Sequence, residues 1–363
     1  MVLIKNSLLN MITREIPSML SYKIHIDKDS SFNTPPVFAI YCVLLNLRLI
    51  KKDGLDIIGK NNKLKSELIY NEIDNNKCFS GFSNFDDRSE RQKKLWQKDT
   101  FEAGLPFVDF ESMCNDVSSK LDMLRLIRDV GFVVLENVPT KEGQVLKVIS
   151  ELGYTRETNY GALFEVRTEV NPNNLAYTNM GLGSHTDNPY RDPVPTVQLL
   201  HCLESSTEGG DSVLVDGFKA AAVLRQESKE DFDILTSTWI NFRFSDTKTD
   251  LRSRVPMIEL NDNSEIVKVR YNNRSIDTIN LPTNKIRSFY KAYRHWSEII
   301  ERDNLKVIFK LSEGDLMLLD NTRIMHARTA FSKKGKRHLQ GAYTDLDGLY
   351  SQLNVLENRQ QNG

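Results

Sequence analysis

The sequence contains few cysteines, and none of them belongs to a closely spaced pair. Cys42, Cys78, Cys114 and Cys202 lie far apart, without a Cys-x-x-Cys motif. Small secreted domains rely on dense cysteine frameworks, and many zinc or redox sites rely on closely spaced pairs. The absence of both patterns predicts a reducing, cytoplasmic setting.

Long hydrophobic runs are also missing. The longest apolar stretch covers residues 37–45 and ends at Asn46, whereas a membrane-spanning helix needs about 20 apolar residues. The first twenty residues carry Lys5, Arg14 and Glu15 among scattered apolar positions, without the continuous apolar segment of a signal peptide. We expect neither a transmembrane helix nor a secretory signal.

Charge of one sign is not in excess. The chain has 48 Lys and Arg against 49 Asp and Glu, a formal net charge of -1. Nucleic-acid binding draws on a surplus of basic residues that neutralise phosphates. The balance therefore predicts no nucleic-acid partner.

The N-terminal quarter of the chain differs from the rest. Residues 1–95 are rich in Asn and Lys, and a run of mixed charge covers residues 86–98. Such a run is typical of a linker or a solvated helix face. We predict two parts, a small N-terminal region of residues 1–95 and a main domain of residues 96–363.

The main domain alternates short β-rich runs with a few helical patterns. Helical spacing covers residues 116–130, 217–228 and 285–302. Strand-like runs cover residues 132–135, 197–202, 212–215, 266–271, 306–311 and 316–319. Many short strands indicate a mainly β, α+β fold, namely a jelly roll or double-stranded β-helix with flanking helices.

Two histidines and one aspartate form a candidate metal site. His185 and Asp187 are two residues apart on an extended segment, so their side chains point the same way. His326 follows an apolar strand and supplies the third ligand. Two histidines and a carboxylate are the facial triad of non-haem iron(II) oxygenases, which leaves coordination positions open. A His-x-Asp pair alone also arises by chance as an ordinary polar pair.

Arg337 strengthens the metal hypothesis. It lies eleven residues beyond His326, on a strand-like run that continues to Tyr343. A buried arginine can bind a distal carboxylate through two hydrogen bonds. The combination predicts an iron oxygenase that uses an organic acid.

Residues 106–358 resemble a known enzyme family through ordered motifs. These are Asn173-Asn174-Leu175-Ala176-Tyr177-Thr178, Ser184-His185-Thr186-Asp187-Asn188-Pro189-Tyr190, Gln198-Leu199-Leu200-His201-Cys202, Gly209-Gly210-Asp211-Ser212, Asp320-Asn321-Thr322-Arg323, and the run from Arg337 to Tyr343. The chain is similar to the γ-butyrobetaine dioxygenase and trimethyllysine dioxygenase family, within the taurine dioxygenase-like group.

The resemblance implies a set of cofactors and their ligands. His185, Asp187 and His326 would bind Fe(2+), and Arg337 with Ser212 would lie near the carboxylate of 2-oxoglutarate. Molecular oxygen would be the second cosubstrate, with ascorbate as the candidate reductant. A halogenase of this class would lack the carboxylate of Asp187, so its presence favours hydroxylation.

The resemblance also implies an aromatic cage for a trimethylammonium group. The matching positions are Tyr160, Phe164, Tyr177 and Tyr343. Aromatic faces attract quaternary ammonium, by roughly 0.5 to 2 kcal/mol per contact. Phe164 stands where the family often has Trp, which weakens the cage. Core packing is the alternative explanation for any single ring.

Two amides match the anionic end of the substrate. The resemblance assigns Asn174 and Asn272 as donors, and an amide serves a carboxylate or a phosphonate equally well. The motif at Arg337 is closer to the butyrobetaine branch. We therefore expect γ-butyrobetaine, converted to carnitine, with 2-trimethylaminoethylphosphonate or trimethyllysine as alternatives.

The chain departs from the family at its N-terminus. Family members carry a zinc-binding domain there, but residues 1–95 offer only His25, Cys42 and Cys78, at spacings unlike a zinc site. This leaves a homodimer as a candidate assembly only. A non-catalytic protein that binds 2-oxoglutarate is the second alternative, and the complete triad argues against it.

Overall fold

The computed structural model describes residues 37–75, 93–167, 179–332 and 334–362. The chain divides into two compact units, residues 1–89 and residues 90–363. In the described part of the first unit, helices α3 (Val37–Asp53) and α4 (Leu55–Asn75) are joined at Gly54, which has a positive φ of 80°. Several of their apolar side chains, among them Tyr41 and Leu68, are exposed. No described helix is long and apolar enough to cross a membrane.

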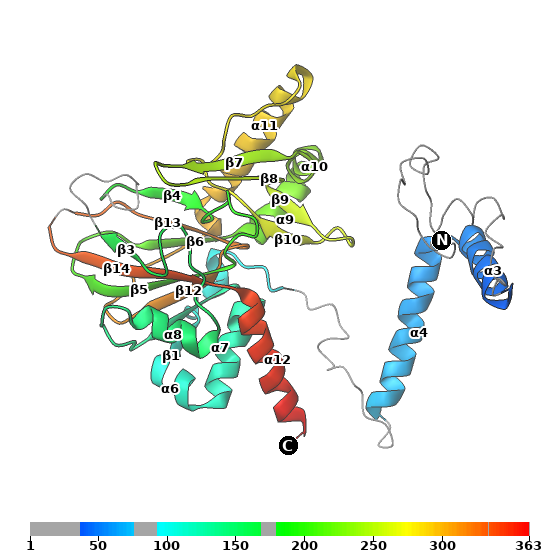
Figure 1. Cartoon of the computed structure of the whole chain (residues 1–363), viewed down its shortest axis with the longest axis horizontal. Coiled ribbons are helices and arrows are strands. Elements are labelled where there is room, and N and C mark those ends of the chain that lie inside the picture. The colour runs from blue at the N-terminus through cyan, green and yellow to red at the C-terminus, as the bar shows by residue number, and fades with distance from the viewer. Residues whose placement is uncertain (1–36, 76–92, 168–178, 333, 363) are drawn as a thin grey trace, which may run out of the picture. The chain divides into compact units, whose positions relative to one another are not determined.

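The second unit is built around two β-sheets with helices packed on them (Figure 1). Its strands are β1 Phe107–Asp109, β2 Phe132–Glu136, β3 Phe164–Arg167, β4 Leu182–His185, β5 Val197–Ser205, β6 Ser212–Asp216, β7 Ile240–Ser245, β8 Asp250–Val255, β9 Ile258–Leu260, β10 Ile266–Val269, β11 Lys306–Phe309, β12 Leu316–Asp320, β13 Ile324–Arg328 and β14 Arg337–Thr344. Its helices are α6 Phe110–Asn115, α7 Val117–Asp129, α8 Gln144–Leu152, α9 Gly217–Glu227, α10 Lys229–Ser237, α11 Thr283–Ile300 and α12 Leu346–Asn362, with short 3-10 turns at Lys98–Phe101 and Asp303–Leu305.

The two sheets contribute different strands to one jelly roll. Within the described part of the chain, the larger sheet has six strands in the order β1-β2-β12-β5-β14-β3, and only the β1–β2 pair is parallel. The smaller sheet has four antiparallel strands in the order β11-β6-β13-β4. Side chains from both sheets meet in one buried cluster that includes Leu214, Met317 and Leu339. The mainly β jelly roll predicted from the sequence is confirmed.

Alternation along the strands places the core on both faces of the larger sheet. In β12, Met317 and Leu319 pack in the cluster between the sheets, whereas Leu316 and Leu318 pack against α7, α8 and α12. Successive strand residues point to opposite faces, so a strand that is apolar throughout must be covered twice. The run Leu316-Met317-Leu318-Leu319 is therefore apolar because helices cover its outer face.

A second layer covers the jelly roll beside the smaller sheet. Helices α9, α10 and α11 pack with β7, β8, β9 and β10 around Phe218, Phe289 and Trp296. The aromatic residues of the helix predicted at 285–302 are mostly core, as expected. Tyr290 is the exception, because 47% of its surface is exposed. It lies on the solvent side of α11.

The elements predicted in the main domain are present. Helices α7, α9 and α11 match the three predicted helical patterns, and β2, β5, β6, β10, β11 and β12 match the predicted strands. The antiparallel hairpin of β7 and β8 was not predicted. Its first strand, Ile240-Asn241-Phe242-Arg243-Phe244-Ser245, alternates apolar and polar residues, and this period of two was the available signal.

Candidate functional site

A cavity of about 530 Å³ lies inside the jelly roll, and both sheets line it. The smaller sheet contributes residues from β4, β6 and β13, and the larger sheet contributes residues from β3, β5, β12 and β14. The residues named in the following paragraphs line it: Tyr160, Phe164, His185, Asp187, Asn188, Tyr190, Gln198, Ser212, Phe244, Asn272, Arg274, Ser275, His326, Arg328, Arg337 and Tyr343.

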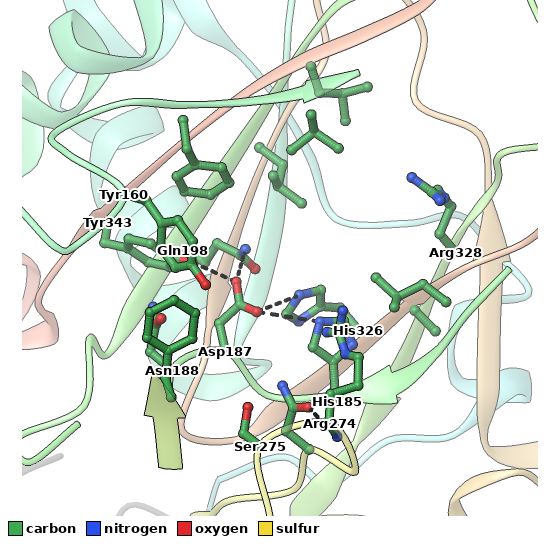
Figure 2. A pocket seen from close by; sticks show the side chains of 18 of the residues that line it. Tyr160, His185, Asp187, Asn188, Gln198, Arg274, Ser275, His326, Arg328 and Tyr343 are labelled. Carbon is green, nitrogen blue, oxygen red and sulfur yellow. Dashed lines mark hydrogen bonds and ion pairs between the residues drawn. The ribbon is translucent and has the colours of Figure 1, made fainter. Parts of the chain in front are cut away.

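Strand register brings the two predicted histidine ligands together. His185 ends β4 and pairs directly with His326 on β13, so their ring centroids are 4.3 Å apart. Asp187 follows β4 by two residues, and its Oδ1 lies 3.4 Å from His185 Nε2 and 3.8 Å from His326 Nε2. Ligand atoms of all three lie within 4.8 Å of one another. Figure 2 shows the three side chains converging on one point.

Neighbouring groups orient two of these ligands. His185 Nδ1 donates to the carbonyl of Gly183 at 2.9 Å, which fixes the tautomer and leaves Nε2 as the basic nitrogen. Asp187 Oδ2 accepts from Gln198 Nε2 at 2.5 Å and from the Tyr343 hydroxyl at 2.7 Å. Oδ1 therefore remains available for a metal ion. Such outer hydrogen bonds hold metal ligands in place.

Burial and charge keep the triad in the protonation states that metal binding requires. Burial, together with the nearby His185, lowers the pKa of His326 to about 3, so its imidazole is neutral. Burial alone would raise the pKa of Asp187, but its contacts with His185 and His326 outweigh burial and hold that pKa below its ordinary value. Neutral imidazole and ionised carboxylate are the metal-binding forms.

The donor set fits iron(II). Among the described residues, His185, Asp187 and His326 are the one group of three such side chains that could hold a metal ion. Two imidazoles and one carboxylate on one side of an ion leave the other positions open, which is the arrangement of non-haem iron(II) oxygenases. A structural zinc site would instead use four protein ligands.

Arginines and a hydroxyl line the side of the cavity next to His326. Arg328 follows His326 on β13 by two residues and pairs in register with Ser212 on β6. The guanidinium groups of Arg328 and Arg337 lie over the ring of Phe331, at 4.9 and 5.5 Å from its centroid. Burial lowers the pKa of Arg328 to about 10 and also lowers that of Arg337. Both arginines remain cationic at neutral pH and can bind an organic anion.

The glycine pair of the Gly209-Gly210-Asp211-Ser212 motif gives Arg337 its space. A Cβ atom on Gly210 would lie 3.1 Å from Cδ and Nε of Arg337, and one on Gly209 would overlap the carbonyl of Ala330. Both glycines have positive φ angles, 77° and 74°. The motif thus lets the backbone approach the arginine closely.

Aromatic side chains line the opposite side of the cavity. Phe164 stacks on Tyr343 with centroids 5.2 Å apart, and Tyr160 lies 6.3 Å from Phe164. Phe244 from the β7–β8 hairpin lies 5.9 Å from Tyr160 and stacks on Tyr190 at 5.2 Å. Of the four predicted cage residues, the structure brings three together and adds Tyr190 and Phe244 to them. We name these five residues the aromatic wall.

Hydrogen bonds fix the hydroxyls of the aromatic wall. The Tyr190 hydroxyl donates to Asn188 Oδ1 at 2.7 Å. The Tyr160 hydroxyl lies 3.2 Å from that of Tyr190, and it must donate there because the proton of Tyr190 is already used. The Tyr343 hydroxyl donates to Asp187, which links the wall to the triad.

The predicted anion-binding amides have different outcomes. Asn272 lines the cavity, where its Oδ1 accepts from the backbone N–H of Arg274 at 3.0 Å and its Nδ2 donates to the Thr186 carbonyl at 3.2 Å. Asn174 and Tyr177 lie outside the described residues, as do His25 and Cys78 of the N-terminal region. Their predicted roles stay predictions.

Sequence reasoning did not assign several residues of this site. Gln198 orients Asp187, Arg274 and Ser275 line the cavity mouth, and Phe244 extends the aromatic wall. Gln198 stood within a recognised motif, which was its signal. Arg274 carries no local pattern, since a single arginine in a loop has no period.

This jelly roll holds a metal-binding triad that leaves coordination positions open, between arginines on one side and the aromatic wall on the other. These features define a metal-dependent oxygenase. The sequence model of the family described as taurine catabolism dioxygenase TauD, TfdA family matches residues 92–343. That match covers well over half of the chain. The protein therefore belongs to the TauD, TfdA family of dioxygenases.

Curated relatives narrow the comparison. The chain is 34% identical over 270 residues to γ-butyrobetaine dioxygenase of Homo sapiens, which covers 72% of this chain and 69% of that protein. It is 35% identical over 254 residues to γ-butyrobetaine dioxygenase of Pseudomonas sp. (strain AK-1), covering 70% and 66%. It is 31% identical over 273 residues to trimethyllysine dioxygenase of Meyerozyma guilliermondii, covering 73% and 68%. The predicted family is confirmed.

Proposed function

We propose that this protein is an iron(II)- and 2-oxoglutarate-dependent dioxygenase that hydroxylates a small trimethylammonium compound, with γ-butyrobetaine as the first candidate and carnitine as its product. The observation that carries the proposal is the position of the aromatic wall. Tyr343 belongs to that wall and donates a hydrogen bond to Asp187, so a cation held there would lie beside the metal ligands.

The chemistry of the wall suits a quaternary ammonium group. Such a cation cannot donate conventional hydrogen bonds, and aromatic faces attract it through their quadrupole. The five rings of the aromatic wall line this part of the cavity, whereas the cationic Arg328 lies on β13 two residues beyond His326 and shares the ring of Phe331 with Arg337. In Figure 2, Tyr160 and Tyr343 lie to the left of Asp187 and Arg328 lies to the right of the histidines.

The remaining roles follow from charge and position. Iron(II) bound by the triad would supply the activation of oxygen, coupled to oxidative decarboxylation of 2-oxoglutarate to succinate and carbon dioxide. Arg337 and Ser212 would bind the distal carboxylate of 2-oxoglutarate, with Arg328 beside them. The aromatic wall would orient one carbon-hydrogen bond of the substrate, and such positioning is the protein's main contribution to catalysis.

The names of the relatives support γ-butyrobetaine over the alternatives. The chain is 34% and 35% identical to the two γ-butyrobetaine dioxygenases and 31% identical to the trimethyllysine dioxygenase. Trimethyllysine and 2-trimethylaminoethylphosphonate remain the alternative substrates. A non-catalytic 2-oxoglutarate-binding protein would not need the oriented triad.

A cytoplasmic location, a homodimer and the absence of nucleic-acid partners are further parts of the proposal.

Succinate formation tests the proposal directly. Protein loaded anaerobically with iron(II) would receive oxygen and 2-oxoglutarate, with γ-butyrobetaine, trimethyllysine or 2-trimethylaminoethylphosphonate in parallel. We expect the strongest stimulation by γ-butyrobetaine, and its loss in His326→Ala. His295→Ala is the matched control, because His295 belongs to an ion-pair cluster of α9, α10 and α11. Absence of stimulation by all three compounds would contradict the trimethylammonium assignment.

A further inference from the structure

Arg274 lies in the loop after β10 and lines the cavity together with Ser275 and Asn272. Arg274 is exposed, although it contributes to the cavity lining. In Figure 2, Arg274 and Ser275 lie below Asp187, on a different side from Arg328. Arg274 is thus a cationic position that is separate from the Arg328 and Arg337 pair.

The loop that carries Arg274 is tied to the metal-ligand segment. Asn272 accepts the backbone N–H of Arg274 on its Oδ1, and its Nδ2 donates to the carbonyl of Thr186, the residue between two of the ligands. Thr186 N–H donates to the Tyr271 carbonyl at 2.7 Å, and Tyr271 N–H donates to Thr186 Oγ1 at 3.0 Å. The backbone of Arg274 is therefore fixed relative to the triad.

Arg274 shares its cavity with the triad, the arginines and the aromatic wall, because His326, Arg328 and Tyr160 line the same cavity. A guanidinium in this lining can therefore bind an anionic group of a substrate that lies beside the triad.

We propose that Arg274 binds the anionic group of the substrate, with Ser275 beside it, while the aromatic wall holds the trimethylammonium group. The inference rests on the proposed function. Arg328, Arg337 and Ser212 supply donors for the carboxylate of 2-oxoglutarate, and Arg274 lines the same cavity at a separate position. Asn272 then acts as a positioning residue, because its side chain is hydrogen-bonded to the loop and to Thr186.

This arrangement makes Arg274 a determinant of specificity. If its positive group lies at the aromatic wall and its negative group at Arg274, the carbon atoms of the substrate between these groups would lie beside the triad. A guanidinium binds a planar carboxylate through two parallel hydrogen bonds, whereas a neutral ester accepts weaker ones. The enzyme should therefore discriminate a zwitterion from its neutralised ester.

Kinetics of Arg274→Ala and Arg274→Lys test the proposal. We expect Arg274→Ala to raise KM for γ-butyrobetaine by about 10- to 100-fold, because a hydrogen bond to a charged group is lost. KM for 2-oxoglutarate and KM for the methyl ester of γ-butyrobetaine should stay close to the wild-type values. Arg274→Lys should raise KM less than Arg274→Ala does, because Lys keeps the positive charge but cannot form the two parallel hydrogen bonds of a guanidinium.

Arg243→Ala is the matched control. Arg243 is another exposed arginine at the cavity mouth, and its guanidinium is bound by Asp250 at 3.0 and 3.1 Å. An equal rise of KM in Arg243→Ala, or an equal rise for the ester, would overturn the proposal. A rise only in KM for 2-oxoglutarate would assign Arg274 to the cosubstrate and also overturn it. Absence of wild-type stimulation by any trimethylammonium compound would instead overturn the proposed function, and this inference with it.

Discussion

The ring of Phe164 occupies the space that a Cβ atom on Gly341 would need. The two residues are register partners on β3 and β14, and a methyl group on Gly341 would overlap three carbons of the ring. Phe164 in turn stacks on Tyr343, two residues along β14. A glycine in the centre of a strand is thus what allows one ring of the aromatic wall to lie against the sheet.

Gly341→Ala should displace Phe164 and impair substrate binding. One aromatic contact with a quaternary ammonium contributes roughly 0.5 to 2 kcal/mol, so we expect KM for γ-butyrobetaine to rise by about 2- to 30-fold. Affinity for 2-oxoglutarate should not change. Steady-state kinetics and a 2-oxoglutarate binding titration would measure both.

Gly181→Ala serves as the control for this substitution. A Cβ atom there would make only ordinary contacts of 3.6 Å with the backbone of Arg328 and Ala330. Unchanged KM in Gly341→Ala, or an equal increase in Gly181→Ala, would show that Phe164 does not act through Gly341.

Gln198→Leu should weaken iron binding although Gln198 is not a ligand. Its Nε2 donates to Oδ2 of Asp187, which keeps Oδ1 directed at the metal position. Loss of such an outer partner typically costs 10- to 100-fold in metal affinity, so we expect a change of about that size. Anaerobic iron(II) titration against a competing chelator measures it. Gln352→Leu on α12 is the control, because Gln352 bonds only the exposed Glu151 carbonyl among its described partners, and an equal effect there would refute the interpretation.

Arg323 and Asp216 form an ion pair that is fully buried, with both side chains 0% exposed. Arg323 also donates to the carbonyls of Asp129 and Lys94. Arg323→Ala would leave Asp216 as an uncompensated buried charge, which typically costs about 3–5 kcal/mol. We expect the free energy of unfolding to fall by that amount in urea titrations. Lys229→Ala breaks an exposed pair and should change it by less than about 1 kcal/mol; similar effects of the two would contradict this ranking.

His295 should make stability depend on pH. Burial opposes protonation of this ring, but hydrogen bonds to Asp231 and Glu227 outweigh burial and raise its pKa. A raised pKa means that the folded state binds the proton more tightly than the unfolded state does. The stabilisation is therefore complete below the unfolded value of about 6.5 and is lost as pH rises through the raised folded value.

Melting temperatures of the wild type and of His295→Gln would reveal this dependence. At pH 5.5 the melting temperature of the wild type should exceed that of His295→Gln by about 1–3 °C. The difference is small because the ion pairs of His295 are partly exposed, and it should narrow at pH 9. Nearby charges act on the same cluster, because Arg302 binds Glu227 and Lys291 lies 3.7 Å from Asp231. A gap that is equal at both pH values would assign the effect to packing.

The metal ligands were predictable because two of them share one short segment and the third follows a recognisable apolar strand. Strand geometry then requires His185 and Asp187 to point to one side. Pairing of β13 with β4 is enough to bring His326 next to them. The jelly roll was predictable for a similar reason, since apolar runs such as Leu316-Met317-Leu318-Leu319 need cover on both faces.

Residues brought in by tertiary structure were not predictable. Phe244 reaches the aromatic wall only because the β7–β8 hairpin packs beside Tyr160 and Tyr190, and neither contact is local in sequence. Arg274 depends on a loop held by Asn272 and Thr186, 86 residues apart. A periodic pattern of apolar residues gives no information about contacts between residues so far apart in the sequence.

The pairing of His185 with His326 also has a mechanical consequence. Among the described strands, β4 closes the order of the smaller sheet and is hydrogen-bonded to β13 alone. A metal ion held by both histidines therefore clamps this edge strand to its neighbour. Separating the strands would break the coordination, so the free energy of metal binding adds to the work of opening the edge. The rate of amide hydrogen exchange in β4 should then fall as the fraction of iron-loaded enzyme rises.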